Sequence, residues 1–404
     1  MNTDNQKQRI DAKITSILLA LFADTKIINL FVLEAKPTLE GSFMTAMYAI
    51  VVVGLFYMGL IRQKKSFGQL SFSHIAVCII CVLWYFATLA LVGEPSVSVS
   101  FFGIFMVASF IIPGLIRIDL KTFLMALFIM PSVGIFYLNQ IFISSVAEEG
   151  ILSMGISYCL LIPVLANLVY LRYFFLSESR LIQLIILPFT AINIYYLVQM
   201  TMFGSRGPLF CIILLIAAFL IFKVNDDSKI SINRRRLSLL IIGAFIVFIC
   251  FSQLLQLIND FLSDYSISLN AVDKFLIMEE NGDMSNGRKG ISKVAWEGIW
   301  NSPIIGHGIS QFERNTGIIY PHNFIIQMLY DGGLVLTLVV FVPIFKSLKR
   351  KIRIINKHDF ICLMLLFFSS VPGALFSGDL WQSNILWLFS GFVLSKSTIY
   401  ENTI

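Results

Sequence analysis

The sequence contains little charge for its length. Only 13% of its 404 residues are charged, whereas 57% are hydrophobic. A soluble domain carries about 25% charged residues, so this chain has too few of them to cover a surface in contact with water. The low charge therefore excludes a soluble, fibrous or disordered protein and predicts an integral membrane protein.

Residues that form disulfides or bind metals are also scarce. There are six cysteines, and the one close pair, Cys78 and Cys81, lies in the apolar run 75–92. Thiols in such a run behave as small hydrophobic groups, so no disulfide framework is expected. The spacing of the four histidines is not that of a zinc site: His74, His307, His322 and His358. We predict neither a metal nor a cofactor.

The N-terminal segment lacks the small-residue cleavage site of a signal peptide, so we expect the first apolar run to remain as a membrane anchor. Apolar windows of helix length predict an all-α polytopic protein with about 12 transmembrane helices. Asp24 interrupts the first window. It marks either a bend in the span or a functional carboxylate buried within it. The expected spans are 14–33, 42–61, 72–92, 97–115, 122–143, 151–171, 181–200, 207–222, 237–257, 323–345, 360–376 and 381–395.

The placement of the basic residues sets the expected orientation. With the N-terminus and C-terminus in the cytoplasm, the cytoplasmic segments hold 22 of the 30 basic residues, as the positive-inside rule requires. The basic loops 223–236 and 346–359 are then topology signals, and no nucleic-acid partner is expected. The other eight basic residues are Lys26, Lys36, Arg206, Lys274, Arg288, Lys289, Lys293 and Arg314.

One connection is much longer than the others. Residues 258–322 form a large extracytoplasmic loop within what we expect to be a single integral membrane domain, 1–404. Within the loop, Arg288–Trp300 has the pattern of an amphipathic helix. Its apolar residues fall on one side: Ile291, Val294, Ala295 and Ile299.

Three polar residues on the extracytoplasmic side are not explained by topology. Arg206 lies in Gly-Ser-Arg-Gly-Pro at the start of a span, Arg288 opens the amphipathic helix, and His322 precedes the span 323–345. Taken singly, each has an ordinary structural explanation. Together, two arginines and a histidine suit a phosphate-bearing substrate, because arginine binds phosphate oxygens in pairs and histidine transfers protons near neutral pH. Carboxylates on this side are candidates for binding sugar hydroxyls: Glu279, Glu280, Asp283, Glu297, Glu313 and Asp331.

Three motifs in the region 200–345 resemble those of the O-antigen ligase/polymerase family of bacterial envelope glycosyltransferases. They are Ser205-Arg206-Gly207, the run Asn286 to Phe312 with its arginine, helix, proline and Gly-x-Gly, and the run Pro321 to Gly333. The last is similar to the family's His-Asn-x9-Gly motif. Each motif is weak alone, and their order and spacing carry the resemblance.

The resemblance implies a GT-C-like fold and an inverting, metal-independent glycosyltransferase of the bacterial inner membrane. Its substrate would be an oligosaccharide linked to undecaprenyl pyrophosphate, and a chain-length regulator and a flippase are possible partners. Arg206 and Arg288 would bind the pyrophosphate, and His322 would assist the acceptor hydroxyl. Ser205, Asn323 and Lys289, which adjoin them, would contact the substrate.

Within the family, Leu336 stands where the ligase motif expects Gly, Thr or Tyr. This departure favours a repeat-unit polymerase over a ligase that delivers glycan to lipid A-core. A lipid-linked sugar flippase or transporter is the alternative from another class, although transporters usually show repeats and ionisable groups near the midplane.

Overall fold

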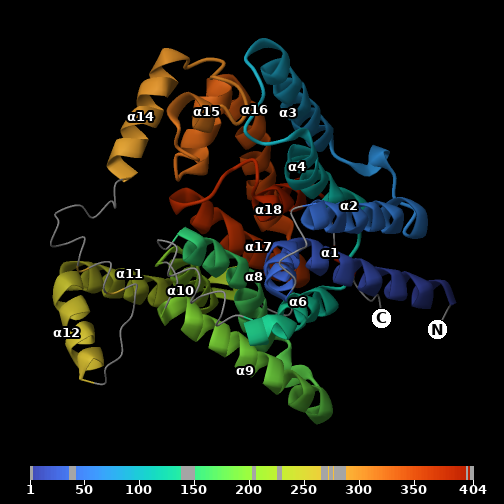
Figure 1. Cartoon of the computed structure of the whole chain (residues 1–404). Helices are drawn as coiled ribbons and strands as arrows, with labels where there is room; N and C mark the ends of the chain where they lie inside the picture. Colours follow the sequence, from blue (N-terminus) through green and yellow to red (C-terminus); the bar gives the residue numbers. More distant parts are fainter. Residues whose placement is uncertain are drawn as a thin grey trace.

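The computed structural model describes residues 3–35, 42–137, 151–202, 206–224, 230–264, 272, 276, 288–396, 399 and 400. The fold is all-α, as predicted for a polytopic membrane protein (Figure 1). In chain order the elements are α1 (Thr3–Ala35), α2 (Ser42–Tyr57), η1 (Met58–Arg62), η2 (Phe67–Gln69), α3 (Phe72–Leu91), α4 (Val99–Phe101), η3 (Phe102–Ala108), α5 (Ser109–Leu115), α6 (Leu120–Ile129), η4 (Met130–Gly134), α8 (Ile151–Tyr173), η5 (Phe175–Ser177), α9 (Arg180–Met202), α10 (Arg206–Ile221), β1 (Phe222–Val224), β2 (Ile230–Ile232), α11 (Arg234–Ile249), α12 (Phe251–Ser263), α14 (Arg288–Asn301), α15 (Phe312–Thr316), α16 (Phe324–Ile354), α17 (Lys357–Phe376) and α18 (Asn384–Leu394).

Most of the predicted spans coincide with helices. Among the described residues, eight helices are long and apolar enough to cross a membrane, and three shorter apolar helices lie at 99–115, 206–221 and 384–394. The window 237–257 is not one helix, because α11 ends at Ile249 and α12 begins at Phe251. The break coincides with a change of pattern: α12 is amphipathic, with apolar and polar residues on opposite sides. The total of twelve spans remains a prediction.

The core of the bundle lies around α17 and α18. These two helices lie at the centre of the molecule (Figure 1), where α18 packs against α5 and α16, and α17 packs against α8 and α10. Gly391 lets α18 approach α5, because a Cβ there would overlap the carbonyl oxygen of Phe110. Trp381 and Trp387 are fully buried and stack with their ring centroids 5.8 Å apart. A buried centre of this kind holds the ends of the helices in fixed positions.

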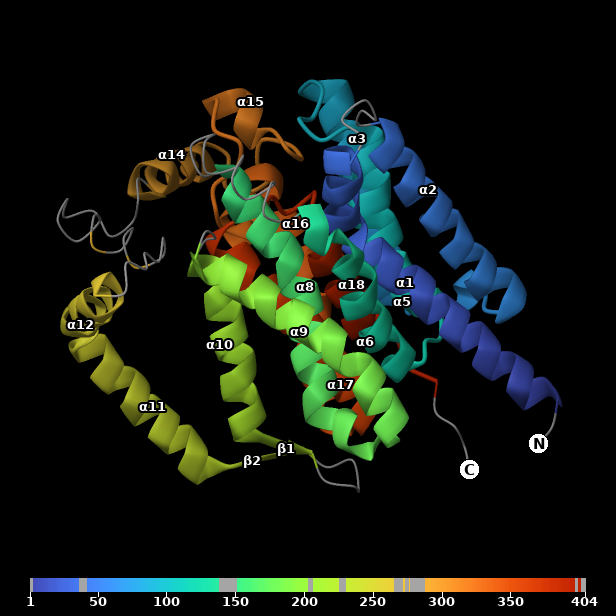
Figure 2. The same cartoon turned by 60° about the horizontal axis from the view of Figure 1, so that its bottom comes forward.

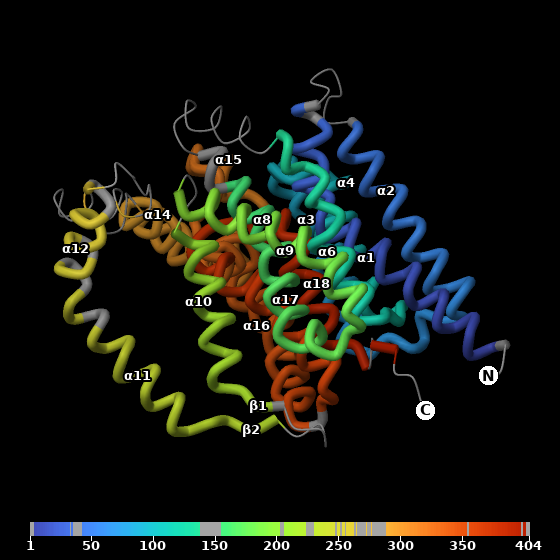
Figure 3. The backbone as a smooth tube through the Cα atoms, turned by 90° about the horizontal axis from the view of Figure 1, so that it is seen from below, coloured from blue at the N-terminus to red at the C-terminus, as the bar shows by residue number. Residues whose placement is uncertain are grey.

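The outer helices expose apolar side chains. Leu181 and Leu184 on α9 are 69% and 64% exposed, and Leu239 on α11 is 67% exposed. In a membrane these surfaces face lipid, which is the natural solvent for them. The pair α11 and α12 stands apart from the bundle, beyond α10 (Figures 2 and 3).

The two ends of the bundle differ in what they carry. One end, here called the site face, carries α14, α15 and the start of α16 (Figure 2). The opposite end, here called the terminal face, carries both chain ends and the hairpin in which β1 pairs antiparallel with β2. The C-terminal segment is held there by a hydrogen bond from the Tyr400 amide to the Ile118 carbonyl oxygen, 2.7 Å long.

Candidate active site

The first part of the site is the segment that leads into α16. Asn323 caps this helix: its Oδ1 accepts hydrogen bonds from the amides of Ile325 and Ile326, at 2.9 and 3.2 Å. The Asn323 side chain also donates to the carbonyl oxygen of Leu375, 3.2 Å away near the end of α17. These bonds satisfy amides that a helix start leaves open. They fix where His322, the preceding residue, must lie.

His322 is held in an uncommon backbone conformation. Its φ is +57°, in the left-handed region, and its ring packs edge-on against Tyr320 with centroids 4.6 Å apart. Its Nδ1 is buried and has no hydrogen-bond partner within the described part of the chain. Such a constrained residue with an unsatisfied nitrogen is typical of functional sites.

Arg206 is the first residue of α10, where the helix dipole adds to its positive charge. The next residue, Gly207, contacts Tyr158 on α8 so closely that a Cβ would overlap the tyrosine hydroxyl. A Cβ at Gly373 on α17 would also crowd the Tyr158 ring. Glycine at 207 therefore lets the start of α10, and Arg206 with it, pack directly beside Tyr158.

Arg288 is the first residue of α14, as the amphipathic pattern predicted. The buried side of α14 is formed by Ala295 and Ile299, which pack with Phe312 and Tyr330 in a small separate core. Gly298 permits this approach, since a Cβ there would overlap the Tyr330 ring. The helix that carries Arg288 is thus fixed on α16.

A kink in α16 provides the second attachment. Gly333 interrupts the helix with φ +59° and ψ −166°, a conformation that strongly favours glycine. A Cβ there would overlap the backbone of Ile304. The kink frees backbone amides and carbonyls of α16, and these form hydrogen bonds with the segment that follows α14. The four bonds are Leu334 N to Pro303 O at 2.9 Å, Val335 N to Ile304 O at 3.1 Å, His307 N to Tyr330 O at 2.9 Å and Gly308 N to Asp331 O at 2.8 Å. The Gly-x-Gly and His-Asn-x9-Gly motifs are therefore two halves of one contact.

Electrostatic interactions show that the three predicted residues converge. The charge of Arg288 acts on Arg206, on His322 and on the Tyr158 hydroxyl. Burial lowers the pKa of His322, and the nearby Arg288 lowers it further. The imidazole is therefore neutral at pH 7 and able to accept a proton. The site face combines two positive charges that suit an anion with a neutral base beside them.

The connection between α17 and α18 forms another wall of the site, and no residue of it was predicted from the sequence. The Ser377 Oγ lies 3.4 Å from the hydroxyl oxygen of Tyr320. Two residues later, Asp379 Oδ1 accepts hydrogen bonds from the Gln327 side chain at 3.1 Å and from the Trp381 amide at 2.7 Å. Burial raises the pKa of Asp379. The signal for it was a lone carboxylate in the short break between two apolar runs.

The other predicted contact residues fall in different surroundings. Ser205 lies outside the described residues, as do Glu279, Glu280 and Asp283. Lys289 is exposed on α14, and Asn323 serves as the helix cap described above. Asp331 is fully buried, and its Oδ2 accepts hydrogen bonds from the Trp381 indole at 2.6 Å and from the Ser310 amide at 3.1 Å. It therefore holds the fold together and is not placed to touch a sugar.

Asp24 is buried inside α1, and neither carboxylate oxygen has a hydrogen-bond partner among the described residues. Glu297 and Glu313 are exposed on α14 and α15. In the described ranges, no three histidine, cysteine or acidic side chains are grouped so that they could hold a metal ion.

The fold and this cluster define a multi-pass all-α membrane protein with a positively charged site at one end of the bundle. Residues 165–341 match the family model Wzy_C, described as O-antigen ligase. This match over 165–341 supports the O-antigen ligase/polymerase family and confirms the resemblance seen in the motifs. The matched segment contains Arg206, Arg288, His322 and Gly333. No curated protein matches the chain.

Members of this family are glycosyltransferase-like enzymes that act on lipid-linked glycans in a membrane. That substrate class agrees with the setting of the cluster. At the site face the three side chains lie beside helices that expose apolar side chains, such as Ile213 on α10.

Proposed function

We propose that the protein is a polymerase that joins oligosaccharide repeat units linked to undecaprenyl pyrophosphate. The proposed chemistry is inverting, metal-independent glycosyl transfer at the site face, with both chain termini in the cytoplasm. The observation that carries the proposal is the convergence of Arg206, Arg288 and His322, which come from three separate elements. Their match to the family's motifs supports it.

The two arginines account for binding and departure of the leaving group. As the acceptor oxygen attacks the anomeric carbon, the bond from that carbon to the pyrophosphate oxygen breaks, and negative charge grows on the pyrophosphate. Guanidinium groups bind two phosphate oxygens at once and stay charged at any physiological pH. Arg206 and Arg288 would therefore stabilise the leaving pyrophosphate more than the intact donor, as catalysis requires.

His322 accounts for the proton. The acceptor hydroxyl loses its proton as it attacks, and a neutral imidazole has the lone pair to receive it. The lowered pKa of His322 keeps that lone pair available near neutral pH. Asp379, on the neighbouring connection, lies close enough to Gln327 and to the start of α16 to steady this wall of the site.

The ligase of the same family is the second candidate, and the description of the matching family model fits it as well. Both activities use the same donor and differ in the acceptor. Leu336, the residue that departs from the ligase motif, is fully buried and contacts Gly332 closely. Its role in α16 is packing, so any effect on acceptor choice would be indirect.

The test supplies purified protein in detergent with the lipid-linked repeat unit as sole substrate and follows the products by gel electrophoresis. A polymerase extends one donor with another and produces a ladder of lipid-linked chains. A ligase gives products only after lipid A-core is added. A flippase forms no glycosidic bond under either condition, and that result would refute the assignment as a glycosyltransferase.

The variant Arg206→Lys tests the role of the arginine. It keeps the charge and loses the paired donors, so the rate of polymer formation should fall by about 10²–10³. Arg314→Lys is the matched control, because Arg314 lies on α15 at the same face and pairs with Glu94 at 3.3 Å. An Arg206→Lys protein that forms long polymer at the wild-type rate would remove this residue from the mechanism.

A further inference from the structure

A second cluster of positive charge surrounds a cavity on the terminal face. The cavity has a volume of about 310 Å³ and is lined by Lys65, Arg117 and Lys396, among other residues. These three come from the connection after α2, the connection after α5 and the end of α18. None of the proposed chemistry uses them, because they lie at the opposite end of the bundle from His322.

Within the described part of the chain, no carboxylate neutralises the charges of this basic pocket. Lys65, Arg117 and Lys396 form no ion pair with the residues that the structure describes. Arg62 and Lys121, on the same face, do form ion pairs, with Asp11 at 2.7 Å and with Glu178. Partial burial and the charges of Arg117 and Lys396 lower the pKa of Lys65. Lys65 is thus close enough to Arg117 and to Lys396 for their charges to repel its own.

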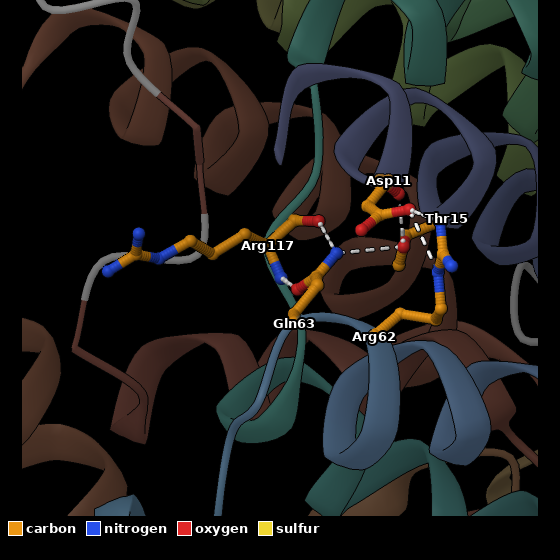
Figure 4. Close-up of polar contacts among 5 residues, drawn as sticks. All are labelled: Asp11, Thr15, Arg62, Gln63 and Arg117. Atoms are coloured by element: carbon orange, nitrogen blue, oxygen red, sulfur yellow. Dashed lines mark hydrogen bonds and ion pairs between the residues drawn. The ribbon is translucent and has the colours of Figure 1, made fainter. Parts of the chain in front are cut away.

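Each of the three is held by its backbone in spite of that repulsion. The Lys65 amide donates to the Gly59 carbonyl oxygen at 2.9 Å. The Gln63 side chain bonds both the amide and the carbonyl of Arg117, at 2.6 and 2.9 Å, and the Arg117 side chain extends away from this contact (Figure 4). The buried Lys351 donates to the carbonyl oxygen of Lys396 at 3.2 Å. The fold therefore maintains the cluster.

The start of α3 adds to the positive potential. Ser71, which caps this 20-residue helix, lines the pocket with His74. The N-terminus of a helix carries a partial positive charge and unpaired amides, which favour an anion. Three cations and a helix start around one cavity suit a phosphate group.

The surroundings of the pocket favour a lipid as the source of that phosphate. A stripe of exposed apolar side chains runs along α3 from the residue beside the pocket, at helical spacing: Phe72, Ile75, Ile79, Leu83 and Phe86. Phe72, which follows the lining residue Ser71 in the sequence, is 85% exposed, and Phe67, which precedes the lining residue Gln69, is 50% exposed. Acyl chains can lie along this stripe while a headgroup occupies the pocket.

We propose that the basic pocket binds the phosphate headgroup of an anionic membrane lipid, with the acyl chains against the exposed stripe of α3. This site is separate from the proposed glycosyl-transfer site and would stand even if that function were wrong. Its chemistry is shared by soluble phosphates, so the experiment must separate the two sources.

The test measures lipid binding by native mass spectrometry of the full-length protein in detergent, with dioctanoyl phosphatidylglycerol and dioctanoyl phosphatidylcholine as probes. We expect phosphatidylglycerol to be retained preferentially. The triple variant Lys65→Gln/Arg117→Gln/Lys396→Gln should weaken its binding by about tenfold or more, since each basic residue near an anionic lipid contributes severalfold. The matched control, Lys349→Gln/Arg350→Gln/Arg353→Gln, removes three exposed charges near the end of α16 and should leave binding unchanged.

Three results would overturn the proposal. Equal loss in both triple variants would show that net charge, not the pocket, attracts the lipid. Equal retention of phosphatidylcholine would exclude recognition of an anionic headgroup. Binding of soluble glycerol phosphate as tightly as phosphatidylglycerol would exclude the lipid as source. If the triple variant fails to fold, the exposed single site Lys396→Gln should still weaken binding by about fivefold, and no weakening there would also refute the proposal.

Discussion

The two positively charged clusters of this protein lie at opposite ends of one bundle and are held in different ways. The site-face cluster, Arg206, Arg288 and His322, is carried by helix starts that are fixed by buried packing and close glycine contacts. The basic pocket, Lys65, Arg117 and Lys396, is carried by connections fixed through hydrogen bonds near the surface. A site that stabilises a transition state needs its groups held to a fraction of an ångström. A headgroup site tolerates more movement, because charge near the lipid provides most of the attraction.

The largest effect should come from breaking the rigid support of the site face. Gly333→Ala puts a Cβ into the backbone of Ile304 and into a backbone conformation that costs about 1–3 kcal/mol for other residues. We expect the segment after α14 to separate from α16, with polymer formation reduced by about a hundredfold or more and a lower thermal unfolding midpoint. Lipid binding in the basic pocket should be unaffected.

Gly290→Ala is the control for that variant. Gly290 lies on α14 with open space where a Cβ would be, and alanine is the better helix former. This variant should keep full activity and be at least as stable as the wild type. If Gly333→Ala were equally harmless, the kink would have no part in placing Arg288.

A smaller effect concerns the electrostatics within the site-face cluster. Burial and the Arg288 charge both disfavour protonated His322 and so lower its pKa below 6.5. The acceptor-activating form is then lost only as the pH falls through this lowered pKa. In the variant Arg288→Gln, one of the two causes is removed, so the acidic limb of the kcat/KM profile should move to higher pH, besides the overall loss of rate.

The measurement is the pH dependence of polymer formation in wild type, Arg288→Gln and the control Arg314→Gln. Arg314 is on the same face but is not among the charges that act on His322, so its removal should leave the limb in place. An acidic limb at the same pH in all three proteins would mean that His322 is not the titrating group.

The three residues of the site-face cluster could be predicted from the sequence. The contacts that hold them in place could not. Arg206, Arg288 and His322 were recognisable because the predicted orientation left few basic residues on their side and because motifs flanked them. Gly333 was recognisable as a motif glycine, but its conformation depends on Ile304, which arrives from a different segment of the chain. Tyr158 and Asp379 sit on α8 and after α17, and their place at the site depends on how the helices pack.

The basic pocket shows the same limit more strongly. Lys65, Arg117 and Lys396 belong to the set that the positive-inside rule explains, and by themselves they look like topology signals. Only the tertiary arrangement brings the three connections together around one cavity. Hydropathy was also insufficient around Cys250. It predicted one span over 237–257, whereas α11 ends at Ile249 and α12 begins at Phe251.

The smallest effect should come from loosening the support of the basic pocket. Gln63 joins Arg117 to Thr15, with its Nε2 donating to the Thr15 hydroxyl at 2.8 Å (Figure 4). Gln63→Ala removes these bonds at a partly exposed position, where each is worth about 1 kcal/mol. Because the charges themselves remain, phosphatidylglycerol binding should weaken by only about threefold, and polymer formation should not change. Gln183→Ala, which removes a comparable 2.9 Å bond to the Phe175 carbonyl oxygen, is the control for general loss of stability. A loss of lipid binding as large as that of the triple charge variant would mean that this pocket, like the site face, depends on exact placement, and the contrast between the two clusters would not hold.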